Sequence, residues 1–264
     1  MDEIIKKVEN KVGTITINRP EKRNALTQIL LIDLHLTLKK WADNGDVWTV
    51  IITGAGEKAF SSGYDIVSLP TDIPPEMEEV LKNNNPLELA LNSIKAYPFP
   101  VIAMMNGYTF GAGLNLAICC DIRIAVDKIK FGMPPAKLGL VYHPDGIRQF
   151  IEVIGISKAK ELFFTARAYT ADQAKEMGVV DYLISEDALS SFTYEMAGDI
   201  VSNAPLSLKG AKKIFNMLTQ SSHRLSDEHV REAEQLIRES FNSEDLKEGQ
   251  MAFIEKRKPC FKGK

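Results

Sequence analysis

The stretch "PVIAMMNGYTFGAGLNLAICCDIRIA" (Pro100 to Ala125) contains a strand, a turn, a helix and a second strand in close succession. "VIAMM" and "DIRIAV" are short apolar runs of strand length, and "LNLAICC" between them has the character of a helix. Glycines gather in the turn that follows the first strand. Strand, helix and strand at this spacing predict βαβ-type units and therefore an α/β core.

The same alternation extends toward the N-terminus. "VGTITINRP" (Val12 to Pro20) predicts a strand stopped by proline. "VWTVIITGAG" (Val47 to Gly56) is a continuous apolar run, which is typical of a strand buried on both faces. Between them we expect a helix that ends at Asn44-Gly45, because four large apolar side chains share one helical face: Leu31, Leu34, Leu38 and Trp41.

The second half of the chain is mostly helical in pattern. Thr170 and Gln173 form a predicted capping box, and "VVDYLI" (Val179 to Ile184) interrupts the helices with a strand. We therefore expect a core over residues 1–186 and a C-terminal helical region over residues 187–264. The proline-rich stretch from Leu69 to Pro86 breaks the alternation, and such an insertion predicts a binding lid or a mobile loop.

Composition excludes several classes of function. The 264 residues are 45% apolar and 25% charged, with a net charge of −3 and no basic stripe, so we expect no nucleic-acid partner. No apolar run approaches the roughly 18 residues of a membrane span, and the acidic N-terminus is unlike a signal peptide. Three cysteines without a CxxC pair predict neither a disulfide framework nor a metal site. A cytoplasmic location is expected.

Two glycine-containing turns share one physical design: "AFSSGYDI" (Ala59 to Ile66) and "NGYTFGAGLNLA" (Asn106 to Ala117). Small residues at the start of a helix let a ligand approach backbone N–H groups, where the helix dipole favours negative charge. Two such turns could direct two N–H groups at one carbonyl oxygen, as in an oxyanion hole. The alternative is that the glycines only permit tight turns and close packing. Neither turn carries a nucleotide-phosphate motif.

Taken together, the chain resembles the crotonase (enoyl-CoA hydratase/isomerase) superfamily over nearly its whole length. The resemblance implies a spiral of ββα units with a C-terminal helical region, assembled as a trimer or a dimer of trimers. It implies an acyl-CoA thioester substrate and no separate cofactor, since coenzyme A enters with the substrate. The matching stretches are "ITINRPEKRNAL", "VIITGAGEKAFSSGYDI", "PVIAMMNGYTFGAGLNLAICCDIRIA", "FGMPPAKLGL" and "TARAYTADQAKEMGVVDYLI".

The resemblance also implies roles for individual residues. The backbone N–H groups of Tyr64 and Ala112 would form the thioester oxyanion hole. Lys22 and Arg23 lie where the family approaches the CoA phosphates, although a solvated charged turn is the alternative for this pair. Further contacts with CoA or the acyl group are implied for Ala25, Ser62, Asp65, Ile66, Gly111 and Asn115, and, from a neighbouring subunit, for Phe253 and Lys256.

The chain departs from the family at the catalytic positions. Family hydratases carry two glutamates, which would fall at Asn115 and Pro135. Isomerases of the superfamily carry a carboxylate where this chain has His143. Here the chain resembles the methylmalonyl-CoA decarboxylase branch, which carries a tyrosine at the position of Tyr142 and also lacks both glutamates. That branch differs in having a histidine at the position of Tyr64 and an asparagine at the position of His143. Without a catalytic role, Tyr142 would be a ring packed in the pocket wall, and His143 would be a surface histidine in a loop.

These departures favour decarboxylation of a (methyl)malonyl-CoA-type substrate, which needs no base because the electrons of the broken C–C bond pass to the thioester oxygen. In this hypothesis Tyr142 holds the leaving carboxylate. The first alternative is an enoyl-CoA isomerase in which His143 transfers the proton, or an enoyl-CoA hydratase. The alternative from another class is a non-catalytic protein that binds acyl-CoA or RNA.

Overall fold

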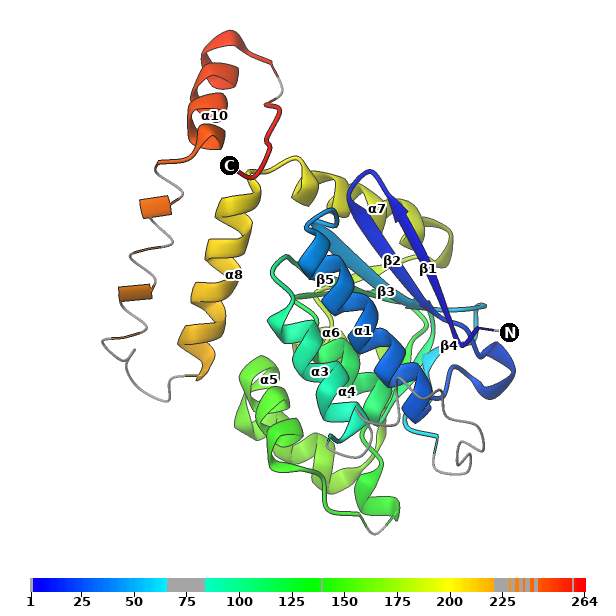
Figure 1. Ribbon diagram of the computed structural model, residues 1–264. Coiled ribbons are helices and arrows are strands. Elements are labelled where there is room, and N and C mark those ends of the chain that lie inside the picture. Colours follow the sequence, from blue (N-terminus) through cyan, green and yellow to red (C-terminus); the bar gives the residue numbers. More distant parts are fainter. Residues whose placement is uncertain are drawn as a thin grey trace.

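The computed structural model describes residues 2–65, 84–138, 140–220, 242–257 and 259–264, together with residues 228, 231, 232, 235, 238 and 239. It confirms a mixed α/β fold in which helices surround two sheets (Figure 1). The predicted lid from Leu69 to Pro86 lies almost entirely outside the described residues.

The larger sheet has the strand order β1-β2-β3-β5-β7-β10. Only β1 and β2 pair antiparallel, and every other neighbouring pair is parallel. All six residues of β3 are buried, as the continuous apolar run predicts. The strand bounds are β1 Ile4–Glu9, β2 Val12–Ile17, β3 Thr49–Gly54, β5 Val101–Met105, β7 Ile122–Val126 and β10 Tyr182–Ile184.

The smaller sheet has the order β4-β6-β8-β9, with β4, β6 and β8 parallel and β9 antiparallel to β8. Its first three strands each follow a strand of the larger sheet along the chain, which produces the ββα repeat. Because β4 and β6 are parallel neighbours, the turns that follow them emerge at the same edge of the sheet. The strand bounds are β4 Ala59–Ser61, β6 Tyr108–Phe110, β8 Lys130–Gly132 and β9 Ala168–Thr170.

The helices of the core begin and end as the local sequence predicts. In the first of them the Thr27 side chain caps the Leu30 N–H, and Gly45 ends it with φ 73°. Both hydrogen bonds of the capping box between Thr170 and Gln173 are present. The bounds are α1 Gln28–Asn44, α3 Pro86–Ala96, α4 Ala112–Cys119, α5 Pro144–Thr165 and α6 Ala171–Glu176, with the short 3-10 helices η1 Pro20–Lys22 and η2 Pro135–Leu138.

Three further helices follow: α7 Glu186–Val201, α8 Pro205–Gln220 and α10 Glu244–Glu255. Helix α7 packs against β3, β5 and β7, so it covers the larger sheet. Helix α10 stands apart from the sheets, at one end of the molecule (Figure 1). The predicted division at residue 186 stays a prediction. Helix α7 follows this residue and buries Leu189 and Ala197 in the common core.

A buried lysine ties α8 to the core. Lys212 is 6% exposed, and its ammonium lies 2.7 Å from the Asp121 carboxylate. It also donates to the carbonyl oxygens of Phe99 at 2.9 Å and Ile94 at 3.3 Å. The ammonium therefore has three partners, which come from the last turn of α3, from the loop between α3 and β5, and from the residue before β7.

We expect Lys212→Met to lower the free energy of unfolding by about 2 kcal/mol, because two carbonyls and a carboxylate lose a charged donor. The matched control is Lys213→Met, whose side chain is exposed and pairs with Glu232, and which should cost about 0.5 kcal/mol or less. Urea unfolding of both variants measures the difference. An equal decrease in the free energy of unfolding for both variants would show that the buried contacts of Lys212 add no more stability than an exposed ion pair.

Candidate functional site

The two glycine turns meet at the edge of the smaller sheet. Gly63 follows β4 with φ 105°, and Gly111 follows β6 with φ 53°, so both backbones occupy a region that side chains disfavour. A Cβ atom on Gly63 would lie 3.0 Å from the Phe110 carbonyl oxygen and 3.5 Å from the Ala112 nitrogen. Only a chain without a side chain at this position brings the two turns so close.

The backbone N–H groups of Tyr64 and Ala112 have no hydrogen-bond acceptor among the described residues. Leu26 donates to the Gly63 carbonyl at 2.8 Å and accepts from the Asp65 N–H at 2.9 Å, so the Tyr64 N–H between them points to the opposite side of the chain. Ala112 is the first residue of α4, where N–H groups lack an intrahelical acceptor. Two free donors therefore lie on adjoining turns, one of them at a helix N-terminus that favours negative charge.

Close packing of α4 on β4 positions this helix N-terminus. A Cβ atom on Gly113 would lie 2.6 Å from the Ser61 Cβ and 2.8 Å from its carbonyl oxygen. The Ser61 hydroxyl in turn accepts the Gly63 N–H at 3.2 Å. Glycine at position 113 and serine at position 61 thus set the distance between the two turns.

One helical turn into α4, Asn115 lies at the centre of a buried chain of hydrogen bonds. Its side chain is 0% exposed. The Tyr142 hydroxyl donates to Asn115 Oδ1 at 2.8 Å, and Asn115 Nδ2 donates to Gln149 Oε1 at 2.7 Å. A side chain on Gly146 would overlap the Tyr142 ring, so this glycine is required for the ring's position. Burial raises the pKa of Tyr142 far above its usual range, so the phenol keeps its proton.

His143 precedes α5 and lies beside the Tyr142 ring in sequence and in space. Its Nδ1 is 3.4 Å from Glu88 Oε1 and 3.9 Å from Asp145 Oδ2, and 56% of its side chain is exposed. Glu88 comes from α3, so two separate helices hold the imidazole. A cavity of about 70 Å³ joins these groups, and its described lining includes Leu87, Leu91, Asn92, Asn115, Tyr142, His143 and Gln149.

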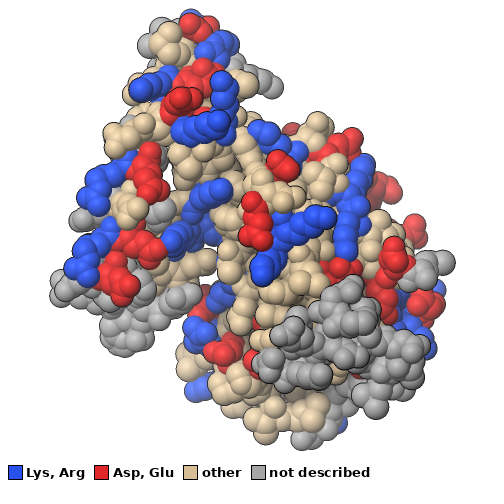
Figure 2. Space-filling model, in the orientation of Figure 1, with Lys and Arg blue, Asp and Glu red and all other residues tan. Residues whose placement is uncertain are grey.

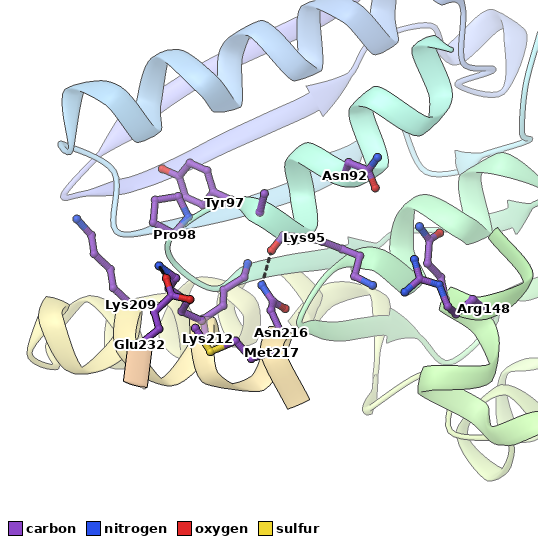
Figure 3. Close-up of a pocket in the computed structure, with 13 residues that line it drawn as sticks. Asn92, Lys95, Tyr97, Pro98, Arg148, Lys209, Lys212, Asn216, Met217 and Glu232 are labelled. Carbon is purple, nitrogen blue, oxygen red and sulfur yellow. Dashed lines mark hydrogen bonds and ion pairs between the residues drawn. The ribbon is translucent and has the colours of Figure 1, made fainter. Parts of the chain in front are cut away.

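A larger cavity of about 930 Å³ lies between the end of α3, α5 and α8 (Figure 3). Lysine and arginine dominate its polar lining, but carboxylates partner most of them: Lys95 pairs with Glu152 at 2.8 Å, and Lys212 pairs with Asp121. Asn216 also donates to the Lys95 carbonyl at 2.9 Å, which links α8 to α3. Asn92 and Gln149 line both cavities, so the two adjoin.

Lys22 and Arg23 are exposed at the end of η1, where Arg23 has φ 51°. The fully buried Asn24 holds this turn against β4: its Nδ2 donates to the Ala59 carbonyl at 2.7 Å, and its Oδ1 accepts the Arg19 N–H at 3.0 Å. Sequence patterns do not reveal Asn24, because its partners lie in other segments. The arrangement presents two cations to solvent near the glycine turns.

Several predicted contact residues already have partners within the chain. Arg19 donates to the Ala25 carbonyl at 2.7 Å and to the Asp65 carboxylate at 2.9 Å, and the Ser62 N–H donates to the Arg23 carbonyl at 2.9 Å. These bonds order the turn. The roles of Ala25, Ser62 and Asp65 stay predictions.

Three predicted residues are not brought into this cluster. Ile66 and the Phe253 side chain lie outside what the structure describes. Lys256 is exposed just after α10, which Figure 1 separates widely from α4. A role for Lys256 at a neighbouring subunit stays a prediction. On the face drawn in Figure 2, Lys and Arg are interspersed with Asp and Glu.

Comparison with known proteins identifies relatives that span the chain. Residues 7–264 match the model of a family described as enoyl-CoA hydratase/isomerase. A short-chain-enoyl-CoA hydratase of Clostridium acetobutylicum is 34% identical, over 98% of this chain and 97% of that protein. A methylmalonyl-CoA decarboxylase of Escherichia coli is 33% identical, over 96% of this chain and 95% of that protein.

The fold has close relatives among solved structures as well. An enoyl-CoA hydratase from Bacillus anthracis superposes with a TM-score of 0.89 at 29% identity, covering 100% of both chains. This agreement extends to the ββα spiral with its C-terminal helices. Among the helices that the structure describes, none has both the length and the apolar character for crossing a membrane.

Proposed function

The chain belongs to the enoyl-CoA hydratase/isomerase family, and from this premise we propose that it catalyses proton transfer on an enoyl-CoA thioester, adding water across the double bond or moving the bond along the acyl chain. Two of the three relatives described above are named as hydratases, which supports this alternative above decarboxylation, the reaction that the sequence alone favours. The substrate is an acyl-CoA, and the proton is transferred next to its thioester.

The two free N–H groups of Tyr64 and Ala112 are the proposed oxyanion hole. They bind the thioester oxygen, on which negative charge develops when the enolate forms. The N-terminus of α4 adds a favourable dipole at the same point. Substrate and enolate differ in charge on this oxygen, so these donors stabilise the transition state more than the ground state.

His143 is the proposed proton-transfer group, and its position carries the proposal. It lines one cavity with Asn115 and Tyr142, and the Glu88 carboxylate lies 3.4 Å from its Nδ1. A carboxylate at one imidazole nitrogen orients the ring and supports the protonated form that arises when the other nitrogen accepts a proton. Asn115 and the buried Pro135 occupy the positions of the hydratase glutamates and cannot accept a proton, so we assign this work to His143, with the Glu88 carboxylate of the same cavity as its partner.

Hydration proceeds in two steps. The oxygen of a water molecule forms a bond to C3 while His143 takes its proton, and the electrons of the C2–C3 double bond move to the thioester oxygen. His143 then returns the proton to C2, and the thioester carbonyl re-forms. In isomerisation His143 removes a proton beside the thioester and returns it further along the acyl chain, with the same enolate between the two transfers.

A short acyl chain is the proposed acyl group, because one relative is named a short-chain-enoyl-CoA hydratase. Two leucines, Leu87 and Leu91, supply the apolar part of the lining of the cavity beside His143. We propose a substrate with about four acyl carbons.

Decarboxylation of a malonyl-type thioester is the second candidate, and one observation favours it. Asn115, Tyr142 and Gln149 form an uncharged wall, which would not repel a substrate carboxylate. A methylmalonyl-CoA decarboxylase is among the relatives at a similar identity. The same oxyanion hole would serve this reaction.

Incubation with crotonyl-CoA, a 3-enoyl-CoA, malonyl-CoA and methylmalonyl-CoA, followed by mass analysis of the products, tests the proposal. We expect a gain of one water on crotonyl-CoA or interconversion of the enoyl isomers. Loss of CO2 from a malonyl-type substrate, with both enoyl substrates unchanged, would replace the proposal with decarboxylation. A heat-denatured sample controls for spontaneous loss of CO2.

Assembly is part of the proposal, because the expected CoA contacts of Phe253 and Lys256 lie far from the glycine turns of the same chain. We propose a homo-oligomer, a trimer or a dimer of trimers, in which these contacts reach the CoA of a neighbour. Light scattering after gel filtration measures the mass. A monomer at micromolar concentration would remove both residues from the site.

Arg23→Ala should raise KM for any acyl-CoA about 3- to 10-fold and leave kcat nearly unchanged, because a phosphate contact binds ground and transition states alike. Steady-state kinetics on the best substrate of the panel measures both constants. Lys160→Ala removes an exposed charge from α5 and serves as the control with no expected effect. A fall in kcat at unchanged KM would assign Arg23 a different role.

A further inference from the structure

We propose that Gln149 is a positioning residue which, through Asn115, turns the Tyr142 hydroxyl away from the substrate, so that the pocket presents an acceptor oxygen and selects a hydrogen-bond donor. The preferred group is a water molecule or a 3-hydroxyl group, and a carboxylate is disfavoured. The inference deepens the proposed function and rests on it, since it specifies what the enoyl-CoA site holds beside the double bond.

The direction of the hydrogen bonds carries this inference. A phenol has one proton to donate, and Tyr142 gives it to Asn115 Oδ1 at 2.8 Å. Asn115 Nδ2 donates onward to Gln149 Oε1 at 2.7 Å. The Tyr142 hydroxyl and the Asn115 amide nitrogen thus both donate to groups of the chain itself. The Tyr142 oxygen is left with lone pairs only, and these are what a ligand meets.

Packing holds all three groups in this arrangement. Asn115 and Gln149 are both buried, so losing the bond between them leaves polar groups poorly solvated. Gly146 leaves room for the Tyr142 ring, which also packs against Phe163 with ring centroids 5.5 Å apart. The raised pKa of Tyr142 keeps the phenol protonated, so its proton remains committed to Asn115.

The chemical consequence differs for the two substrate classes. A water molecule can donate one hydrogen to the Tyr142 oxygen and the other to His143. A lone pair of the water oxygen then points at the substrate. A 3-hydroxyl group can donate in the same way. A substrate carboxylate has only acceptors, so it would face the lone pairs of Tyr142 without a hydrogen bond.

Gln149→Met tests the inference, because it removes the acceptor of Asn115 Nδ2 at similar side-chain size. Asn115 Nδ2 is then left with only the long contact to Cys119 Sγ at 3.7 Å. Turning the amide gives this nitrogen the Tyr142 oxygen as its acceptor, which frees the hydroxyl to donate into the pocket. We expect the ratio of Kd values for 3-hydroxybutyryl-CoA and malonyl-CoA, measured by calorimetry on the full chain, to move about tenfold toward malonyl-CoA.

Two further variants distinguish positioning from a structural role. In a Tyr142→Phe background the Gln149→Met effect on the ratio should vanish, because no hydroxyl remains to be turned. Gln149→Glu keeps an acceptor for Asn115 and should retain the wild-type preference for the hydroxyl ligand. A ratio unchanged by Gln149→Met, an effect that persists without the Tyr142 hydroxyl, or a Gln149→Glu protein that behaves like Gln149→Met would each overturn the inference.

The test also separates this inference from the proposed function. The binding ratio reports on hydrogen bonding in the pocket, whereas enoyl-CoA turnover in the substrate panel reports on the reaction. Because 3-hydroxybutyryl-CoA is the product of the proposed hydration, product analysis after each titration checks that this ligand is unchanged. Thermal unfolding of each variant shows whether it is folded. Should Gln149→Met fail to fold, the ratio of Kd values for the two ligands is compared between Gln149→Glu and Tyr142→Phe, and equal ratios would overturn the inference.

Discussion

Ala112→Pro is expected to lower kcat by at least about 10²- to 10³-fold while CoA binding largely survives, because it deletes one of the two proposed oxyanion donors. Proline has no N–H, and its ring carbon would occupy the space where the thioester oxygen is expected to bind. The fold should tolerate the change, because Ala112 is the first residue of α4, a position where proline is common in helices. The loss would therefore reflect chemistry rather than unfolding.

The control for this experiment is Ala112→Gly, which keeps the N–H and removes only a methyl group. Its kcat should stay within a few-fold of the wild-type value. Circular dichroism and the Kd of free CoA, measured on both variants, establish that the helix and the binding site persist. If Ala112→Pro also retained activity within a few-fold, Ala112 would have no part in the mechanism.

Local patterns predict the elements of this fold well, because their causes are local. The apolar run at β3 reflects burial on both faces, and Thr170 with Gln173 satisfies helix N–H groups within four residues. The pairing of β4 with β6 is different. It joins short strands whose sequences show no partner, yet it brings the two glycine turns together. Here the family resemblance, rather than any periodicity, supplied the prediction.

The residues of the candidate site also fall into those that the sequence predicts and those that it does not. The sequence indicates Asn115 and His143 because they stand where the family carries other groups, and Tyr142 because one branch of the family carries a tyrosine there. Sequence patterns do not reveal Gln149 and Glu88, because the Gln149 bond to Asn115 spans 34 residues and Glu88 is 55 residues (143 − 88) from His143. A glutamine and a glutamate on predicted helices have no pattern that distinguishes them from surface residues. Only the packing of α3, α4 and α5 shows that they face the pocket.

The comparison of His143→Ala with Tyr142→Phe decides between the two candidate reactions. If His143 transfers the proton in an enoyl-CoA reaction, His143→Ala should reduce kcat/KM for the enoyl substrate about 10²- to 10⁴-fold. Tyr142→Phe removes one hydrogen bond of a neutral pair and should cost about tenfold or less. Glu88→Gln keeps the shape of the His143 partner without its charge, so its effect should be smaller than that of His143→Ala but in the same direction.

Decarboxylation reverses the order, and this reversal makes the experiment decisive. There Tyr142 would hold the departing carboxylate, so Tyr142→Phe should cost about 10- to 150-fold, while His143→Ala would slow only a reprotonation that water can partly replace. Each variant is therefore assayed on crotonyl-CoA and on methylmalonyl-CoA, because a loss on both substrates alike would indicate a disturbed pocket. Small and equal effects of both substitutions on both substrates would contradict the role of His143 and that of Tyr142 together, and would direct attention to the Tyr64 side chain beside the oxyanion hole.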